Sequence, residues 1–389
     1  MDTGRLPGVF ICGRQHSGNT MLTHLIGRMT GCVFHDDEDI VLEHRARLDA
    51  LETAAERVDW IVQKLWLPSD VRDAVAAELR ALAEQRPHAD TIAIFHKALS
   101  LATHAVDGQS WARKATSYVF HADVILRRMP HVKLVYVMRN PLDACASHKR
   151  RDPKGENLIG SALGWKRGSE LAAHYQRAFP GRFHIVRYED LLAAPEQTVR
   201  ELCDFLLQPY DPSLLDVPLI NPAENEYKIV EGARGIQQDR ANRYALTLTP
   251  AEILLVRTLC TSAALKRWYP DCAALTTRFG PVARLSALML LTRGCVRAPV
   301  QLLRRASINR MPLRDFIALR LRVLLGRAAN NEQAAAVPSL PPASPSPRRA
   351  VGANIFRPAL AGLVAFVLGM LMALSRVQQS DFFSFRFWS

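Results

Sequence analysis

The sequence predicts an α/β protein with a parallel sheet of about five strands and helices on both faces. Over residues 1–275, apolar runs of four to six residues alternate with helical stretches, which is the pattern of buried parallel strands joined by crossover helices. The 389 residues are 49% hydrophobic and 22% charged. This composition is typical of a folded globular protein and excludes a disordered or collagen-like chain.

The strands are expected where β-branched and aromatic residues concentrate. They are Gly8–Cys12, Cys32–His35, Trp111–Lys114, Lys133–Met138 and Phe183–Arg187. The helices are expected between these runs, and a proline suits the first turn of the last of them. They are Met21–Met29, Val41–Leu67, Asp70–Gln85, Val119–Met129, Leu142–His148, Ser161–Ala178 and Pro195–Leu206. Residues 41–110 are expected to form a helical insertion.

The excess positive charge lies in the last third of the chain. Residues 276–389 hold 16 arginines and three acidic residues, which accounts for the whole net charge of +13, and the charges of residues 1–275 balance. Such a segment indicates an anionic surface nearby, either a membrane or a nucleic acid. The expected parts are a globular domain over 1–275, an arginine-rich helical extension over 276–327, a flexible linker over 328–352, a transmembrane helix over 353–376 and an aromatic tail over 377–389.

A membrane anchor is expected near the C-terminus. Pro358–Ser375 is free of charge over 18 residues, and a helix of that length spans roughly 27 Å of a bilayer core of about 30 Å. We therefore expect a C-terminally anchored protein with its globular domain in the cytoplasm. A buried C-terminal helix and a basic RNA-binding tail are the alternatives. Seven scattered cysteines without a C-x-x-C pair exclude a zinc ribbon and suit a reducing compartment, and no N-terminal secretory signal is expected.

A phosphate-binding loop is predicted after the first strand. Gly13-Arg14-Gln15-His16-Ser17-Gly18-Asn19-Thr20 leads from that strand into an apolar helix, and this arrangement directs backbone N–H groups at an anion. The spacing is that of G-x-x-x-x-G-K-T, with Asn19 at the lysine position. Because that lysine neutralises the β- and γ-phosphates, its loss disfavours triphosphate hydrolysis. A structural turn is the alternative.

A second anion site is predicted where the strand Lys133–Met138 ends. It is followed by Arg139-Asn140-Pro141-Leu142-Asp143 and, one turn later, by Ser147. A guanidinium and a hydroxyl in this arrangement can converge on one phosphate. The strand lacks the terminal Asp of a nucleoside triphosphatase, and a solvated arginine beside a helix is the alternative.

Together these motifs resemble the sulfotransferases that use 3′-phosphoadenosine 5′-phosphosulfate, which share a fold similar to that of the P-loop NTPases. The loop His16–Thr20 resembles the family's K/R-S-G-T-T, and Arg139 through Ser147 resembles its R-N/D-P-x-D-x-x-x-S. Two further matches are Val186–Leu192, similar to R-Y-E-D-L, and Ala112–Thr116, similar to the K-T/S-P step of the carbohydrate branch. The order and spacing agree over roughly residues 8–270.

The resemblance implies roles for named residues. The donor's 5′ end would be held by Arg14, Ser17, Gly18, Asn19 and Thr20, and its 3′-phosphate by Arg139, Ser147 and Arg234. Tyr188 would lie near the adenine. Lys114, His16 or Arg14 would stabilise the leaving oxygen, with His16 standing where the family has Lys or Arg. No metal is expected.

A general base is expected shortly after the second strand, where the carbohydrate branch has a glutamate. Glu38 is favoured there, with Asp36, His35 and Glu43 as alternatives. Crowded carboxylates can raise one pKa toward neutrality, and a solvated acidic helix start is the competing interpretation. The insertion 41–110 is expected on the acceptor side or as a packing extension.

The sequence thus predicts a sulfotransferase acting on a hydroxyl, of a carbohydrate or lipid, with no nucleic-acid partner. A P-loop nucleotide or small-molecule kinase and a non-catalytic, membrane-tethered nucleotide-binding protein are the alternatives.

Overall fold

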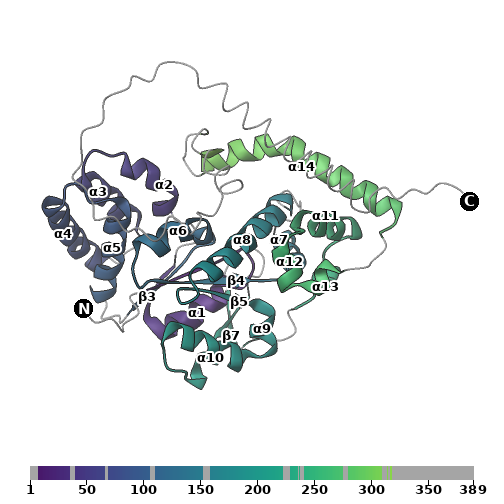
Figure 1. Cartoon of the computed structure of the whole chain (residues 1–389), viewed down its shortest axis with the longest axis horizontal. Coiled ribbons are helices and arrows are strands. Elements are labelled where there is room, and N and C mark those ends of the chain that lie inside the picture. The colour runs from purple at the N-terminus through teal and green to yellow at the C-terminus, as the bar shows by residue number, and fades with distance from the viewer. Residues whose placement is uncertain are drawn as a thin grey trace, which may run out of the picture. The chain divides into compact units, whose positions relative to one another are not determined.

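The core of the protein is a parallel sheet of five strands in the order β2-β3-β1-β4-β5 (Figure 1). The strands are β1 (Gly8–Gly13), β2 (Gly31–His35), β3 (Ser110–Lys114), β4 (Lys133–Met138) and β5 (Phe183–Arg187). The computed structural model describes residues 8–35, 40–65, 69–105, 110–151, 158–221, 228–234, 236, 241–274, 279–308, 313 and 316–317. The predicted α/β class and the five predicted strands are confirmed.

All four strand pairs are parallel, so the carboxyl ends of the strands meet at one edge of the sheet. The register places Lys114 beside Ile11 and beside His35, and Arg187 beside Met138. Side chains that follow the strands are therefore neighbours, which is the usual position of a binding site in an open α/β sheet.

Helices cover both faces of the sheet, as predicted (Figure 1). Val9 and Ile11 pack on one face with residues of α1 and α10, while Phe10 faces the other way, against Phe95 and Tyr118. The helices of this domain are α1 (Asn19–Thr30), α6 (Tyr118–Arg128), α7 (Pro141–Arg151), α8 (Leu158–Ala178), α9 (Tyr188–Ala193), α10 (Pro195–Leu206), α11 (Pro250–Cys260), α12 (Ala263–Trp268) and α13 (Pro270–Ala273). Between α10 and α11 the described residues form two 3-10 turns (Pro212–Leu215 and Tyr244–Leu246) and an antiparallel pair of β6 (Pro218–Asn221) and β7 (Lys228–Arg234).

The insertion between β2 and β3 is helical, with boundaries that differ from those predicted. It contains α2 (Ile40–Asp49), α3 (Ala54–Lys64), α4 (Ser69–Gln85) and α5 (Thr91–Ala105). The prediction of one helix over Val41–Leu67 is wrong, because Thr53 starts a new helix. Its hydroxyl accepts from the Glu56 amide while the Glu56 carboxylate accepts from the Thr53 amide, and this capping box satisfies two helix-end donors.

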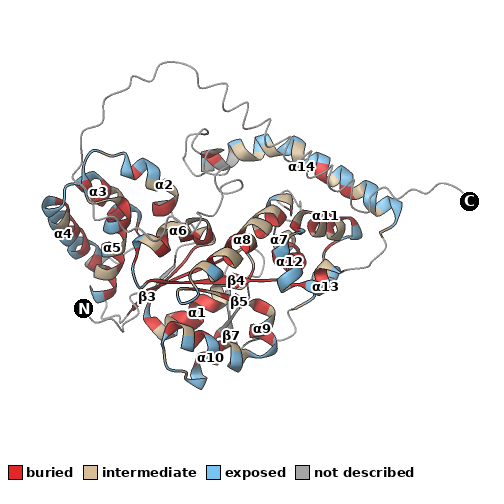
Figure 2. Cartoon of the chain, in the orientation of Figure 1, coloured by how far each residue is buried: buried red, intermediate tan, exposed pale blue. Residues whose placement is uncertain are grey.

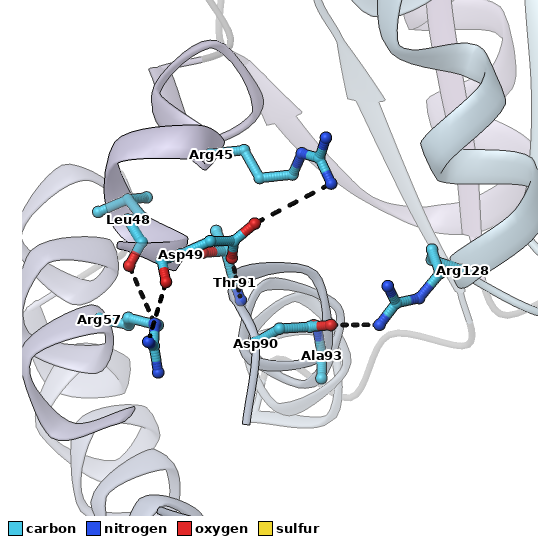
Figure 3. A network of polar contacts seen from close by, with 8 residues as sticks. All are labelled: Arg45, Leu48, Asp49, Arg57, Asp90, Thr91, Ala93 and Arg128. Atoms are coloured by element: carbon cyan, nitrogen blue, oxygen red, sulfur yellow. Dashed lines mark hydrogen bonds and ion pairs between the residues drawn. The ribbon is translucent and has the colours of Figure 1, made fainter. Parts of the chain in front are cut away.

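A buried arginine in α3 holds the segments that connect the helices of this insertion (Figure 3). The Arg57 guanidinium donates to the carbonyl oxygens of Leu48, Asp49, Leu51 and Ala89, so a cation sits at the carboxyl end of α2, where the helix dipole favours it. The carboxylate of Asp49 in turn accepts from the amide of Thr91 at 3.1 Å.

An ion pair joins the insertion to the helix that follows β3. Asp90 caps α5 by accepting from the Ala93 amide at 2.9 Å, and its other carboxylate oxygen pairs with Arg128 of α6 (Figure 3). The start of α5 is therefore connected to α6, which packs on the sheet.

The chain divides into two compact units, residues 1–295 and 296–389, and α14 (Pro281–Ile308) begins in the first and ends in the second. The predicted domain limits at residues 275, 327, 352 and 376 stay predictions. The predicted membrane span Pro358–Ser375 and the linker and aromatic tail lie outside the described residues. Within the part that is described, no helix combines the length and the apolar character needed to cross a bilayer.

Replacing Arg57 by alanine is expected to lower the free energy of unfolding by about 2–4 kcal/mol, because buried carbonyl oxygens lose their donor. The matched control is Arg80→Ala in α4, since Arg80 pairs with Asp59 at 3.0 Å in an exposed salt bridge and its loss should cost no more than about 1 kcal/mol. Urea denaturation of both variants measures the difference. Equal losses would show that Arg57 does not hold the insertion together.

Candidate active site

The loop between β1 and α1 has the geometry of an anion-binding turn. Gly18 adopts a left-handed conformation with φ of 98°, and the first helical bond runs from the Leu22 amide to the Gly18 carbonyl at 3.2 Å. The amides of Asn19, Thr20 and Met21 therefore precede the helical ladder and are available at the positive end of α1. The Ser17 amide is already used, since it donates to the Arg14 carbonyl at 3.1 Å.

The side chain of Asn19 braces the loop and does not extend toward a ligand. Its Nδ2 donates to the carbonyl oxygens of Gly13 and Arg14, both at 3.1 Å. Both hydrogens of that amide are thus engaged, which differs from the phosphate contact predicted for this side chain. Only the backbone amide of Asn19 stays available to an anion.

Ser17 offers a polar group that the loop itself does not satisfy. The residue is fully buried, and among the described residues its Oγ has no hydrogen-bond partner. A buried hydroxyl without a partner costs free energy unless a ligand or water completes it. The role of Ser17 in holding the 5′ end of the donor stays a prediction.

Arg139 connects the end of β4 to the loop. Its Nη1 donates to the carbonyl oxygen of His16 at 2.9 Å, and its own carbonyl accepts from the indole N–H of the buried Trp165 at 2.8 Å. The guanidinium lies over the ring of Tyr188, 4.5 Å from its centroid. The two predicted anion sites are therefore adjacent, as binding of one ligand at both requires.

Residues of the motif after β5 contact both predicted anion sites, the loop after β1 and the segment after β4. Tyr188 is largely buried in the core and packs so close to Gly18 that a Cβ there would lie 2.5 Å from its ring. Glu189 accepts from the Asn140 amide and from the Tyr269 hydroxyl, both at 2.8 Å, and burial raises the pKa of its carboxyl. Contact of Tyr188 with an adenine stays a prediction.

The start of α7 follows from local capping. The Asn140 side chain accepts from the Leu142 amide at 2.9 Å, and Pro141 occupies the first helical position, where its missing N–H costs nothing. This places Ser147 in the second turn of α7, next to His148. Nε2 of His16 and Nδ1 of His148 lie 3.1 Å apart, so α7 contacts the loop directly.

The surroundings of these residues are strongly positive. Burial, followed by the charges of Arg151, His148, Arg14 and Arg139, lowers the pKa of His16 to about 3. His16 is therefore a neutral hydrogen-bonding group at physiological pH and does not replace the charge of the family's Lys or Arg. Burial and then nearby cations also lower the pKa of Arg150, which indicates an excess of positive charge that an anion would relieve.

The loop around Asn242 is held beside this cluster by a residue of α7. The buried carboxylate of Asp143 accepts from the Asn242 amide at 2.7 Å, and burial raises its pKa despite the nearby Arg139. Arg243 follows Asn242 and lies close enough to Arg150 for its positive charge to contribute to the lowered pKa of Arg150. Arg234, which was predicted to hold the 3′-phosphate, ends β7 opposite Pro218, and its side chain lies outside the described part of the structure.

The remaining predicted site residues are placed as follows. The Arg14 side chain contacts α8, and its Nη2 donates to the Gly160 carbonyl and to the Ser161 hydroxyl, both at 3.4 Å. Lys114 ends β3 and is 7% exposed, one strand away from the loop. The favoured base Glu38 and its alternative Asp36 lie outside the described residues, as does the side chain of His35, whereas Glu43 lies in α2 and is partly exposed.

Several residues that position the site were not predicted as site residues. They are Asp143, His148, Trp165, Glu189, Arg243 and Tyr269. Asp143 and Glu189 belong to motifs that the sequence contains, so a motif-based reading could have found them. Trp165 lies in α8 and Tyr269 between α12 and α13, both far from the motifs in the sequence, and neither carries such a signal.

Comparison with known proteins identifies related chains. The family model described as the sulfotransferase family matches residues 7–212. A protein of Aquifex aeolicus (strain VF5) is 26% identical over 148 residues, which cover 34% of this chain and 19% of that protein; the match thus spans about a fifth of the relative's length.

Solved structures give weaker likenesses. The sulfotransferase domain of the curacin biosynthetic pathway is 20% identical with a TM-score of 0.40, over 63% of this chain and 93% of that one. The domain of the Synechococcus PCC 7002 olefin synthase is 18% identical with a TM-score of 0.41, over 67% and 98%. A sulfotransferase from Alicyclobacillus acidocaldarius is 14% identical with a TM-score of 0.35, over 72% and 98%.

Gly18→Ala is expected to lower the free energy of unfolding by about 2–4 kcal/mol, because an added Cβ meets both the left-handed backbone and the Tyr188 ring. Gly31→Ala is the matched control. Gly31 also has a positive φ, of 77°, but open space around its Cβ position, so we expect a loss of only about 1 kcal/mol. Urea denaturation compares the two, and equal losses would contradict the tight packing of Tyr188 beneath the loop.

Proposed function

The chain belongs to the sulfotransferase family, and we propose that it transfers the sulfuryl group of 3′-phosphoadenosine 5′-phosphosulfate to a hydroxyl acceptor. The family match covers more than half of the chain, residues 7–212 of 389. The fold agrees with it, since the loop after β1 and the motif after β4 lie at the same edge of the parallel sheet.

One observation carries the choice of donor, namely the bond from Arg139 to the carbonyl of His16. It puts a guanidinium at the end of β4 next to a loop whose helix amides favour an anion. A ligand with a phosphate at each end of one nucleoside suits two adjacent anion sites of different chemistry. The amides of Asn19 and Thr20 and the Ser17 hydroxyl would hold the 5′ end, and Arg139 with Ser147 the 3′-phosphate.

The proposed step is an in-line displacement at sulfur. The acceptor oxygen forms a bond to sulfur as the bond from sulfur to the bridging oxygen of the 5′-phosphate breaks, and adenosine 3′,5′-bisphosphate leaves. The acceptor proton passes to a carboxylate, for which Glu38 is our candidate, as general base. Catalysis rests on positioning and on stabilising the charge that develops on the leaving oxygen.

The charge for the leaving oxygen has to come from a group other than His16. The low pKa of His16 keeps its ring neutral, so it can supply a hydrogen bond but no cation. Lys114 at the end of β3 is our candidate for that cation, because the register sets it beside Ile11 of the loop strand. Arg14 is less suited, since its guanidinium rests on α8.

The kinase alternative is disfavoured by the same loop. A kinase of this type needs a cation at the position of Asn19, to neutralise the β- and γ-phosphates. Here that side chain is an amide whose hydrogens are bound to Gly13 and Arg14.

Ser147→Ala is expected to weaken binding of adenosine 3′,5′-bisphosphate about tenfold, because one hydrogen bond to a charged phosphate is lost. Its affinity for adenosine 5′-phosphate should not change. Isothermal titration calorimetry with both nucleotides gives the comparison. Ser100→Ala is the matched control, since that hydroxyl donates to the His96 carbonyl of its own helix. Equal weakening for both nucleotides would contradict a 3′-phosphate contact at Ser147.

Labelled sulfate from the donor is expected to appear on a hydroxyl compound of a cell extract, with the product identified by mass spectrometry. Glu38→Gln should lower turnover at least about a hundredfold, because it removes the general base, and leave the affinity for adenosine 3′,5′-bisphosphate unchanged. Full turnover in Glu38→Gln would remove this base assignment alone. Phosphorylated product from ATP and magnesium, with no response to the sulfate donor, would overturn the proposed function.

A further inference from the structure

Helix α14 has two apolar faces, of which folding uses one. On the inner face, Ala287 and Leu291 are buried, and Gly294 lies so close to Ile159 of α8 that a Cβ there would meet it at 2.2 Å. Spacings of three and four residues put these three positions on one side of the helix. This face attaches the first part of α14 to the domain.

The other apolar face is exposed. Val282 is 77% exposed, Leu285 60% and Met289 57%, and Figure 2 shows exposed residues on successive turns of α14. The same spacing continues at Val296, Val300 and Leu303, which are 73%, 66% and 53% exposed. Single exposed apolar residues are ordinary, but a stripe of large ones along one helix indicates a surface that binds something.

The charged residues of α14 are all positive. Arginines occur at 284, 293, 297, 304 and 305 of α14, and the helix has no acidic residue and no lysine. Arg293 and Arg297 are exposed. Arg293 follows Met289 by four residues and precedes Val296 by three, so it borders the stripe.

We propose that α14 lies on an anionic membrane surface, with Val282, Leu285 and Met289 in the acyl boundary and the flanking arginines at the lipid headgroups. An apolar stripe bordered by arginines is the pattern of helices that lie in the plane of the interface, and arginines near the surface are attracted to anionic lipid. A second copy of this chain fits less well, because the same helix would bring like charges together. This inference is independent of the proposed reaction.

Flotation of the full-length protein with vesicles tests the proposal. We expect binding to vesicles that contain phosphatidylglycerol, little binding to pure phosphatidylcholine, and release as salt rises. The double variant Leu285→Glu/Met289→Glu should bind at least about tenfold more weakly, because two apolar side chains no longer enter the lipid. The matched control is Leu246→Glu, which removes an 82% exposed leucine outside α14 and should not change binding.

A local probe separates α14 from any other membrane-binding segment. An environment-sensitive fluorophore on Met289→Cys, in a Cys295→Ser background, should shift to shorter wavelength on anionic vesicles, and the same fluorophore on Leu246→Cys should not. Circular dichroism checks that the variants fold.

Three results would overturn the proposal. They are equal flotation on neutral and anionic vesicles, flotation that the double variant leaves unchanged, and a probe at 289 that stays in water. The probe could instead shift to shorter wavelength without vesicles as the protein concentration rises, while light scattering shows a dimer. That result would assign the stripe to a second copy of the chain.

Discussion

The bond between the Arg139 guanidinium and the His16 carbonyl fixes the distance between the two halves of the candidate site. Parallel pairing of β1 and β4 brings their carboxyl ends together, and Trp165, Tyr188 and Glu189 then hold Arg139 and the residue after it in place. Because these contacts come from α8 and α9 as well as from the two strands, the site depends both on the sheet and on helices that cover it.

Asn19 and His16 depart from the family's loop pattern, and the structure gives a physical explanation for each. Asn19 takes over the internal bracing of the loop, and His16 stays neutral because burial and four nearby basic groups oppose its protonation. Arg139, Arg150 and Arg151, on or before α7, give the surroundings of the loop a positive charge, and Lys114 is our candidate for the cation that the family usually carries in the loop. The site thus keeps an attraction for anions while its loop carries no formal charge at the usual position.

The fold could be predicted from the sequence because buried parallel strands are short apolar runs, which are easily recognised between helical stretches. β4 and β5 agree with the prediction residue for residue, and the sites after β1 and β4 were expected from their motifs. The break between α2 and α3 was missed although Thr53 and Glu56 form a local capping signal, whereas the bonds of Arg57 to the end of α2 are tertiary contacts that the sequence does not show. The supports from Trp165 and Tyr269 are tertiary contacts of the same kind, and the two apolar faces of α14 can be told apart only once the burial of its residues is known.

The most direct measurement is a crystal structure of the protein with adenosine 3′,5′-bisphosphate. Our account predicts the 5′-phosphate on the amides of Asn19 and Thr20 and the Ser17 hydroxyl, and the 3′-phosphate between Arg139 and Ser147. A nucleotide bound elsewhere, or with either phosphate away from these groups, would contradict it.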